Sequence, residues 1–276
     1  MNDYIIAVIL GIVEGVTEYL PVSSTGHMIL VGDWLGFDGP RASVFEVFIQ
    51  LGAILSVLVI YKETFLRMAR QYRCWDLFRR ENWTRNDTGL TLAHVAVGIV
   101  PVMGIGYIAH HAIKTYLFSP GTVIIGLIVG GIFMLAAERA KIRTVCTDVE
   151  RLTIVQAFLV GFCQVLALWP GFSRSGSTIA GGLFFGLSRK AAADFSFIIA
   201  VPIMFVACIY DLLKSLSNLN GNDLVMIAIG FVVAFVVAYI SVLWFLKFLN
   251  KSSLASFAYY RFVIAIVSFI HFFVLG

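Results

Sequence analysis

The sequence predicts an all-α membrane protein that crosses the bilayer several times. Of its 276 residues, 60% are hydrophobic and only 13% are charged, and the mean hydropathy is +0.92. Soluble domains carry about 25% charged residues. The apolar residues also form long runs, several of which approach the roughly 20 residues that a helix needs to cross a hydrocarbon core about 30 Å thick. Together these observations indicate a polytopic helical protein embedded in membrane lipid.

Six segments are long and apolar enough to be full transmembrane helices. They cover residues 43–61, 91–112, 121–137, 192–213, 223–245 and 257–275. The chain starts without the positive charge of a signal peptide, so no cleaved leader is expected. The four cysteines show no CxxC spacing, which argues against a disulfide framework or a zinc site. The net charge of +4 comes from basic residues in the loops between spans, so we expect no nucleic-acid partner.

Two further apolar stretches, residues 4–36 and 153–187, are interrupted by polar segments rich in turn-forming residues. The first contains Pro21-Val-Ser-Ser-Thr-Gly-His27 and the second Pro170-Gly-Phe-Ser-Arg-Ser-Gly176. Irregular backbone survives inside a bilayer only where protein or a water-filled cavity satisfies its polar groups. Each stretch is therefore predicted to be a re-entrant helix–turn–helix hairpin and not a span.

The distribution of Lys and Arg supports this layout. With six spans and two hairpins, 15 basic residues fall in the loops on one side, which are residues 62–90, 138–152, 188–191 and 246–256. Only three fall on the other side, while Arg261 begins the last span and Arg174 lies in the second hairpin. By the positive-inside rule, the rich side is cytoplasmic, so both termini are expected outside.

The chain reads as a single membrane domain, 1–276, built from two inverted repeats. These are residues 1–137 and 153–276, each a hairpin followed by three spans. Gly11-Ile-Val-Glu14 before the first polar segment parallels Gly161-Phe-Cys-Gln164 before the second. Because three is an odd number of spans, the second copy is inserted upside down. Such repeats place a site at their interface near the bilayer midplane, where we expect the two hairpin tips to meet.

The ionisable residues of the hairpins indicate a functional site. Glu14 and Glu18 are four apart, so their carboxylates share one helical face and could hold a divalent metal. Arg174 suits phosphate oxygens, and His27 is placed for proton transfer. Each such residue at mid-bilayer costs roughly 3 kcal/mol. The alternative interpretation is a buried ion pair that only fixes hairpin packing.

Hydroxyls and glycines at the two tips complete a predicted anion-binding site. A helix N-terminus attracts anions, and glycine lets backbone amides approach a ligand closely. The predicted substrate-binding residues are Ser23, Thr25, Gly26, Gly171, Ser173, Arg174, Ser175 and Thr178. Anion site, paired acids and histidine together are typical of phosphoryl chemistry.

These motifs resemble those of a known family. Glu14-xxx-Glu18, Pro21–His27 and Pro170–Thr178 are similar to the signatures of the bacterial undecaprenyl-diphosphatases, or bacitracin-resistance proteins, and the resemblance covers the whole chain. It implies that undecaprenyl diphosphate is dephosphorylated to the monophosphate, the carrier lipid for peptidoglycan and other wall polymers. It also implies that the acids and the serine/arginine motif are essential for activity and that a divalent metal is required. The pocket of such a protein faces the periplasmic side of the inner membrane. The sequence is compatible with a homodimer but does not decide the number of copies.

Our mechanistic hypothesis gives each predicted residue a role. Glu14 and Glu18 hold Mg²⁺ or Ca²⁺, and Arg174 with its neighbouring hydroxyls holds the pyrophosphate. Ser24 attacks the phosphorus, with His27 as general base and then acid. Attack by a water that His27 activates is the alternative. The predicted catalytic residues are Ser24, His27, Glu18 and Arg174.

Two alternatives have to be considered, another type of lipid phosphatase and a membrane transporter. The phosphatidic-acid-phosphatase type needs a histidine six positions after its Ser-Arg, and here that position is Ala180. A flippase or a transporter of a polyprenyl phosphate or small anion is the other alternative, because inverted repeats with broken helices are typical of transporters. The combination of acids, histidine and arginine favours hydrolysis.

Overall fold

The computed structural model describes residues 2–71, 89–215 and 221–275, and it contains helices but no strands over these ranges. Six of the described helices are long and apolar enough to cross a membrane. They are α3 (Gly39–Ile60), α5 (Leu92–Tyr116), α6 (Pro120–Arg139), α9 (Arg189–Ser215), α10 (Gly221–Leu249) and α11 (Ala255–Ile270), the last continuing as a π-helix, His271–Leu275. They confirm the six predicted spans, with ends that differ by a few residues.

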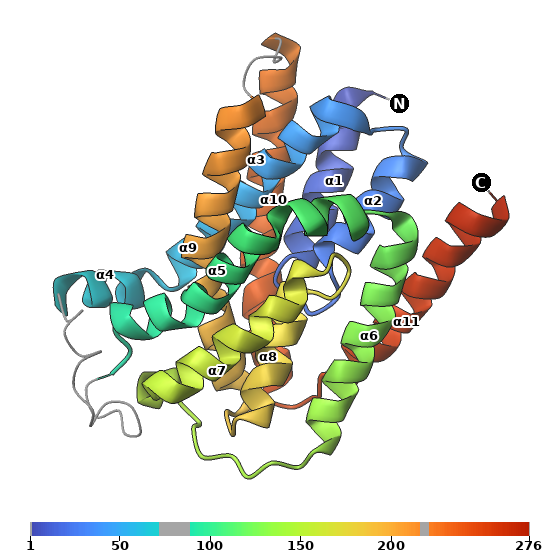
Figure 1. Ribbon diagram of the computed structural model, residues 1–276. Helices are drawn as coiled ribbons and strands as arrows, with labels where there is room; N and C mark the ends of the chain where they lie inside the picture. The colour runs from blue at the N-terminus through green and yellow to red at the C-terminus, as the bar shows by residue number, and fades with distance from the viewer. Residues whose placement is uncertain (1, 72–88, 216–220, 276) are drawn as a thin grey trace.

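The two interrupted stretches form helical hairpins, as predicted. The first consists of α1 (Asp3–Thr17) and α2 (Ser24–Trp34), and the second of α7 (Ile154–Gln164), a 3₁₀ turn (Val165–Leu168) and α8 (Arg174–Phe184). Figure 1 shows the first hairpin entering the bundle from the end that carries both termini, and the second from the opposite end. Their tips lie in the middle of the molecule, so neither hairpin crosses it.

The two tips have the same local geometry. Ser23 and Ser173 both take positive φ angles, 71° and 76°, a region that residues other than glycine rarely adopt. Each serine caps the helix that follows, since Ser23 Oγ accepts from the Gly26 amide at 3.4 Å and Ser173 Oγ from the Gly176 amide at 3.1 Å. The cap satisfies an otherwise unpaired amide in the first helical turn, which offsets part of the backbone strain.

Ion pairs at the two ends of the bundle agree with the predicted sides of the loops. Arg41 at the start of α3 contacts Asp3 of α1 at 2.8 Å and Asp223 of α10 at 2.6 Å. At the opposite end, Glu138 of α6 pairs with Arg189 of α9 at 2.5 and 2.7 Å. The starts of α1, α3 and α10 therefore lie on one side, and the connections at the end of α6 and the start of α9 on the other.

A short amphipathic helix, α4 (Lys62–Gln71), follows α3 within the predicted 62–90 loop. Its Arg67 forms an ion pair with Glu150, which lies in the 138–152 connection. The two loops that the sequence places on the basic side are thus in contact. Trp75 and Trp83, further along the same loop, lie outside the described residues.

Glycines let the first helix of each hairpin pack closely on a spanning helix. A Cβ added at Gly161 of α7 would lie 2.0 Å from the Gly98 carbonyl oxygen of α5. A Cβ added at Gly11 of α1 would lie 2.8 Å from the Gly230 carbonyl oxygen of α10. Within a bilayer, where lipid tails are as apolar as leucine, such close contacts between backbones hold helices together.

Replacing Gly161 by alanine should therefore destabilise the protein, because α7 must move away from α5. Gly104→Ala is the matched control, since a Cβ at Gly104 meets nothing within 4 Å and alanine is the better helix former. Thermal unfolding in detergent should show a lower Tm for Gly161→Ala and an equal or slightly higher one for Gly104→Ala. Equal Tm values for Gly161→Ala and the wild type would contradict the close contact.

Candidate active site

The tips of the two hairpins meet at the centre of the bundle, as the sequence predicts. Arg174 Nη2 donates to Glu18 Oε1 at 2.9 Å, and Ser175 Oγ donates to the carbonyl oxygen of Leu20 at 3.0 Å. The Arg174 guanidinium also lies 5.2 Å from the centre of the Tyr19 ring, in a cation–π contact. Residues more than 150 positions apart in the chain are thus brought into direct contact.

Glu18 links a residue of each tip. Its Oε2 accepts from Ser24 Oγ at 2.5 Å while its Oε1 accepts from Arg174. The carboxylate is buried, with 7% of its side chain exposed, against 15% for Arg174. Charge-assisted hydrogen bonds of this kind are short and strong. Three of the four predicted catalytic residues, Ser24, Glu18 and Arg174, therefore form one connected group.

Glu14 lies one helical turn before Glu18. The Glu18 amide donates to the Glu14 carbonyl oxygen at 3.0 Å, so the helical register that the four-residue spacing predicts is maintained. Glu14 is buried, yet its Oε1 has no hydrogen-bond partner among the described residues. A buried carboxylate oxygen without a donor is a suitable ligand for a cation.

The donor set around Glu14 fits only one mode of metal binding. No group of three or more His, Cys, Asp or Glu in the described parts of the chain could hold a metal ion. Mg²⁺ often binds through one or two carboxylates, completing its shell with waters and substrate phosphates. Glu14 and Glu18 fit that mode, although both Glu18 oxygens already accept hydrogen bonds.

His27 is held between Ser23 and a residue of the last helix. Its Nδ1 lies 2.8 Å from the Ser23 carbonyl oxygen, and its Nε2 lies 2.9 Å from the Tyr260 hydroxyl. The structure gives His27 no hydrogen bond to Ser24. The side chain next to the Ser24 hydroxyl is Glu18, and the sequence alone did not indicate this arrangement.

Most hydroxyls of the second tip bond within the protein. Ser173 caps α8 and also contacts Ser175 at 3.2 Å. Thr178 Oγ1 contacts the Ser196 hydroxyl of α9 at 2.6 Å, and both residues are fully buried. These bonds stabilise the second tip and attach it to α9, and the Ser175 bond to Leu20 attaches it to the first tip.

The remaining predicted substrate-binding residues are two glycines and Thr25. Gly171 has a φ of 89°, and a Cβ there would lie 2.2 Å from the Val123 carbonyl oxygen, so it is needed for the turn and the close approach to α6. Gly26 is buried in the first turn of α2 beside Ser23, its capping residue. Thr25 is the exposed member of this tip.

Sequence reasoning did not anticipate three residues that contact the tips. Tyr19 lies under Arg174, Tyr260 contacts His27, and the neighbouring Arg261 is fully buried. The Arg261 guanidinium donates to the carbonyl oxygens of Leu127, Gly126 and Gly171 at 3.1, 3.1 and 2.8 Å. The sequence did carry a signal for Arg261, because it is a charged residue inside the last apolar run, but we interpreted it as the start of a span.

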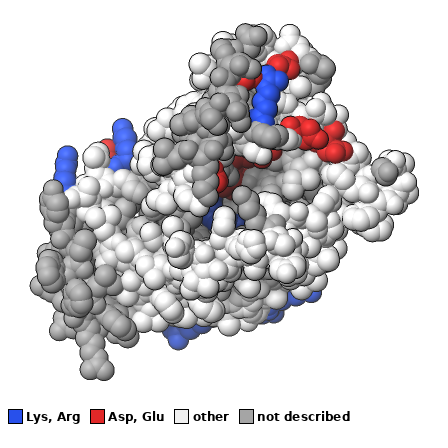
Figure 2. Space-filling view, turned by 45° about the horizontal axis from the view of Figure 1, so that its top comes forward, with Lys and Arg blue, Asp and Glu red and all other residues white. Residues whose placement is uncertain are grey.

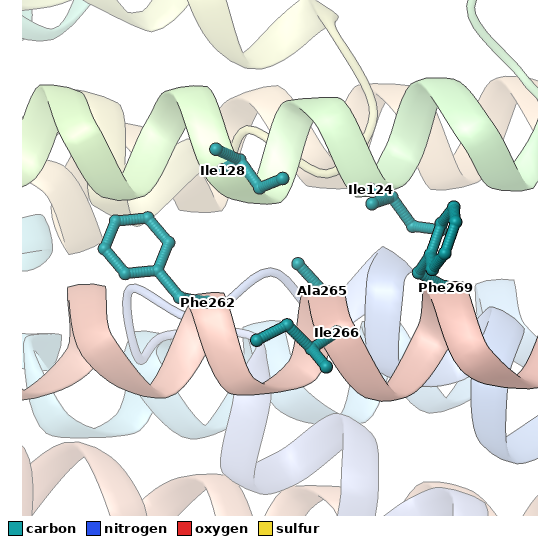
Figure 3. A pocket seen from close by; sticks show the side chains of 6 residues that line it. All are labelled: Ile124, Ile128, Phe262, Ala265, Ile266 and Phe269. Carbon is teal, nitrogen blue, oxygen red and sulfur yellow. The ribbon is translucent and has the colours of Figure 1, made fainter.

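Some side chains of the site reach the surface, since Ser24 is partly exposed and Thr25 is exposed. Figure 2 shows that the face at the end with both termini is hollowed near its centre, and acidic and basic side chains are visible in the hollow. A separate apolar groove of about 370 Å³ runs between α6 and α11 (Figure 3). It is lined by Ile124, Ile128, Phe262, Ala265, Ile266 and Phe269.

Comparison with known proteins agrees with the motifs. The sequence model of the family described as "Bacitracin resistance protein BacA" matches residues 7–267. The chain is 48% identical to an undecaprenyl-diphosphatase 1 of Bacillus cereus, 47% to one of Bacillus thuringiensis and 46% to one of Bacillus anthracis. Each match covers 97% of both chains. This chain therefore belongs to the BacA family of bacitracin resistance proteins.

Proposed function

We propose that this protein hydrolyses undecaprenyl diphosphate to undecaprenyl phosphate and inorganic phosphate, and thereby contributes to bacitracin resistance. The observation that carries the proposal is the group formed by Ser24, Glu18 and Arg174 where two helix N-termini meet. A nucleophile, a proton acceptor and a cation in contact are what phosphoryl transfer requires. The relatives named undecaprenyl-diphosphatase 1 have the same reaction in their name.

Arg174 and the helix N-termini supply the positive potential for the pyrophosphate. Arg174 Nε is buried and has no hydrogen-bond partner among the described residues, so this donor is available to a phosphate oxygen. The starts of α2 and α8 add the partial positive charge of helix N-termini. Preorganised donors of this kind stabilise charge that develops on the leaving group.

Ser24 is the proposed nucleophile. Its oxygen attacks the terminal phosphorus while its proton passes to Glu18, and the bond from that phosphorus to the bridging oxygen breaks, releasing undecaprenyl phosphate. Water then hydrolyses the phosphoserine to inorganic phosphate, and Ser24 recovers its proton. Direct attack by water is the alternative. The contact at 2.5 Å between Ser24 Oγ and Glu18 Oε2 favours the serine and replaces His27 as its immediate proton acceptor.

A divalent cation, Mg²⁺ or Ca²⁺, is part of the proposal, with Glu14 and Glu18 as its protein ligands. When bound, it would neutralise the pyrophosphate oxygens. The unpartnered Glu14 oxygen supports this assignment.

The apolar groove between α6 and α11 is the proposed place for the polyprenyl chain. It faces the lipid-exposed side of these helices and borders the turn of α6 whose carbonyl groups bind Arg261. We further propose that the protein lies in the bacterial inner membrane with both termini and the pocket facing the periplasm. The excess of Lys and Arg in the loops at the other end supports this orientation.

We also propose that the halves 1–137 and 153–276 are inverted repeats. Gly11 and Gly161, offset by 150 positions, each pack a hairpin helix on the second span of the other half. Ser23 and Ser173 match in backbone geometry and capping. Gln164, which corresponds to Glu14, is likewise buried with side-chain atoms that lack partners among the described residues.

Ser24→Ala should abolish the covalent intermediate and lower kcat by at least about 100-fold, since the nucleophile is lost. The measurement is a single turnover with substrate carrying ³²P in its terminal phosphate, quenched in acid. Labelled protein should appear in the wild type and in the control Ser43→Ala, an exposed serine of α3. If the wild type is active but no labelled protein appears, direct attack by water is favoured.

Purified protein should release phosphate from undecaprenyl diphosphate in detergent with Mg²⁺ or Ca²⁺, and EDTA should stop the release reversibly. Arg174→Ala should be inactive, with a loss of about 100- to 1,000-fold, and should have a lower Tm because Glu18 loses its buried partner. A wild type that releases no phosphate with metal present would overturn the hydrolase and leave transport of a polyprenyl phosphate or small anion as the function. Full activity in EDTA would overturn only the proposed divalent cation and would leave the hydrolase assignment unchanged.

A further inference from the structure

Two consecutive residues of α11 reach the two hairpin tips. Tyr260 contacts His27 of the first hairpin, and Arg261 contacts the Gly171 carbonyl group of the second. The other carbonyl groups that Arg261 contacts belong to α6. Successive residues of a helix point about 100° apart, so one turn of α11 can serve both tips.

The contacts of His27 determine its tautomer. A carbonyl oxygen only accepts hydrogen bonds, so Nδ1, 2.8 Å from the Ser23 carbonyl oxygen, carries a proton. In the neutral ring Nε2 then has a free lone pair, which accepts a hydrogen bond from the Tyr260 hydroxyl at 2.9 Å. The two rings also stack, with centroids 5.6 Å apart and planes inclined by 8°. His27 is therefore held from three directions.

Arg261 fixes the rotation of α11 that this contact requires. Its guanidinium is fully buried, and its hydrogen-bond partners among the described residues are carbonyl oxygens and the sulfur of Met134, with no carboxylate. A guanidinium inside the bilayer is costly to move away from such acceptors. With Arg261 held, Tyr260 reaches His27 of α2 while 43% of the residue stays exposed, and its other neighbour, Tyr259, is 54% exposed.

We propose that Tyr260 is a positioning residue for the hydrolysis. Its hydroxyl orients the imidazole of His27, so that the Nε2 lone pair points away from the Ser23 backbone and toward α11. The hydroxyl lies beside Nε2, the ring nitrogen through whose lone pair His27 can accept a proton. This inference rests on the proposed function, in whose second step His27 would take a proton from the water that hydrolyses the phosphoserine.

Tyr260→Phe tests the hydroxyl alone, since phenylalanine keeps the ring that stacks on His27. We expect kcat for phosphate release to fall about tenfold, the change expected for one lost hydrogen bond to a catalytic group, with KM within about twofold. Tyr259→Phe, which removes a hydroxyl from the adjacent exposed tyrosine, should match the wild type. A wild-type kcat in Tyr260→Phe would overturn the proposal without affecting the hydrolase assignment, which the wild type tests.

A second measurement does not depend on activity. In protein labelled with ¹⁵N at its five histidines, the His27 signals are identified by their loss in His27→Gln. In Tyr260→Phe the Nε2 signal should move toward the position of a nitrogen without a hydrogen bond, while Nδ1 stays protonated. Unchanged Nε2 signals would show that the hydroxyl does not bond to His27, and would overturn the proposal even if kcat fell.

Discussion

The contact between Glu18 and Arg174 is the interaction on which the arrangement of the site depends. The two residues come from hairpins that enter the bundle from opposite ends, and neither could be buried alone at this depth without a large cost. Together they neutralise each other and bring the starts of α2 and α8 to one place. The same carboxylate also accepts from Ser24, so the link that holds the tips together includes the proposed nucleophile.

Unpaired backbone groups at the tips impose a second constraint. A turn inside a bilayer exposes carbonyl and amide groups that lipid cannot solvate. The protein satisfies them with side chains: Ser23 and Ser173 cap the helices, Ser175 bonds to the Leu20 carbonyl group, and Arg261 bonds to the Gly171 carbonyl group. Several hydroxyls that suggested substrate contacts therefore have structural partners. The ion-pair interpretation and the catalytic interpretation of these residues are compatible, because Glu18 has both kinds of contact.

The two hairpins are not held equally. α8 packs against α6, α7 and α9 and is almost wholly buried. α2 packs on α1 and less extensively on α6, and it makes two side-chain contacts with α11 and the π-helix that continues α11. These are His27 with Tyr260, and Asp33 with His271 at 2.6 Å. The surroundings of α2 are more open, with Thr25 exposed. Of the two helices that begin at the tips, α8 is therefore the more enclosed and α2 the more open.

The helical membrane class, the six spans, the two hairpins and the family motifs could all be predicted from the amino-acid sequence. These follow from local properties, since hydropathy over about 20 residues and turn-forming residues inside an apolar run are readable in one segment. Which side chains contact one another could not be predicted in this way, because it depends on how the helices pack. His27 bonds to Tyr260, 233 positions away, and not to Ser24, while Arg261 is a buried link and not a residue at the start of a span. Helix rotation and packing set these partners, and glycine contacts such as Gly161 on Gly98 depend on helices that are far apart in the chain.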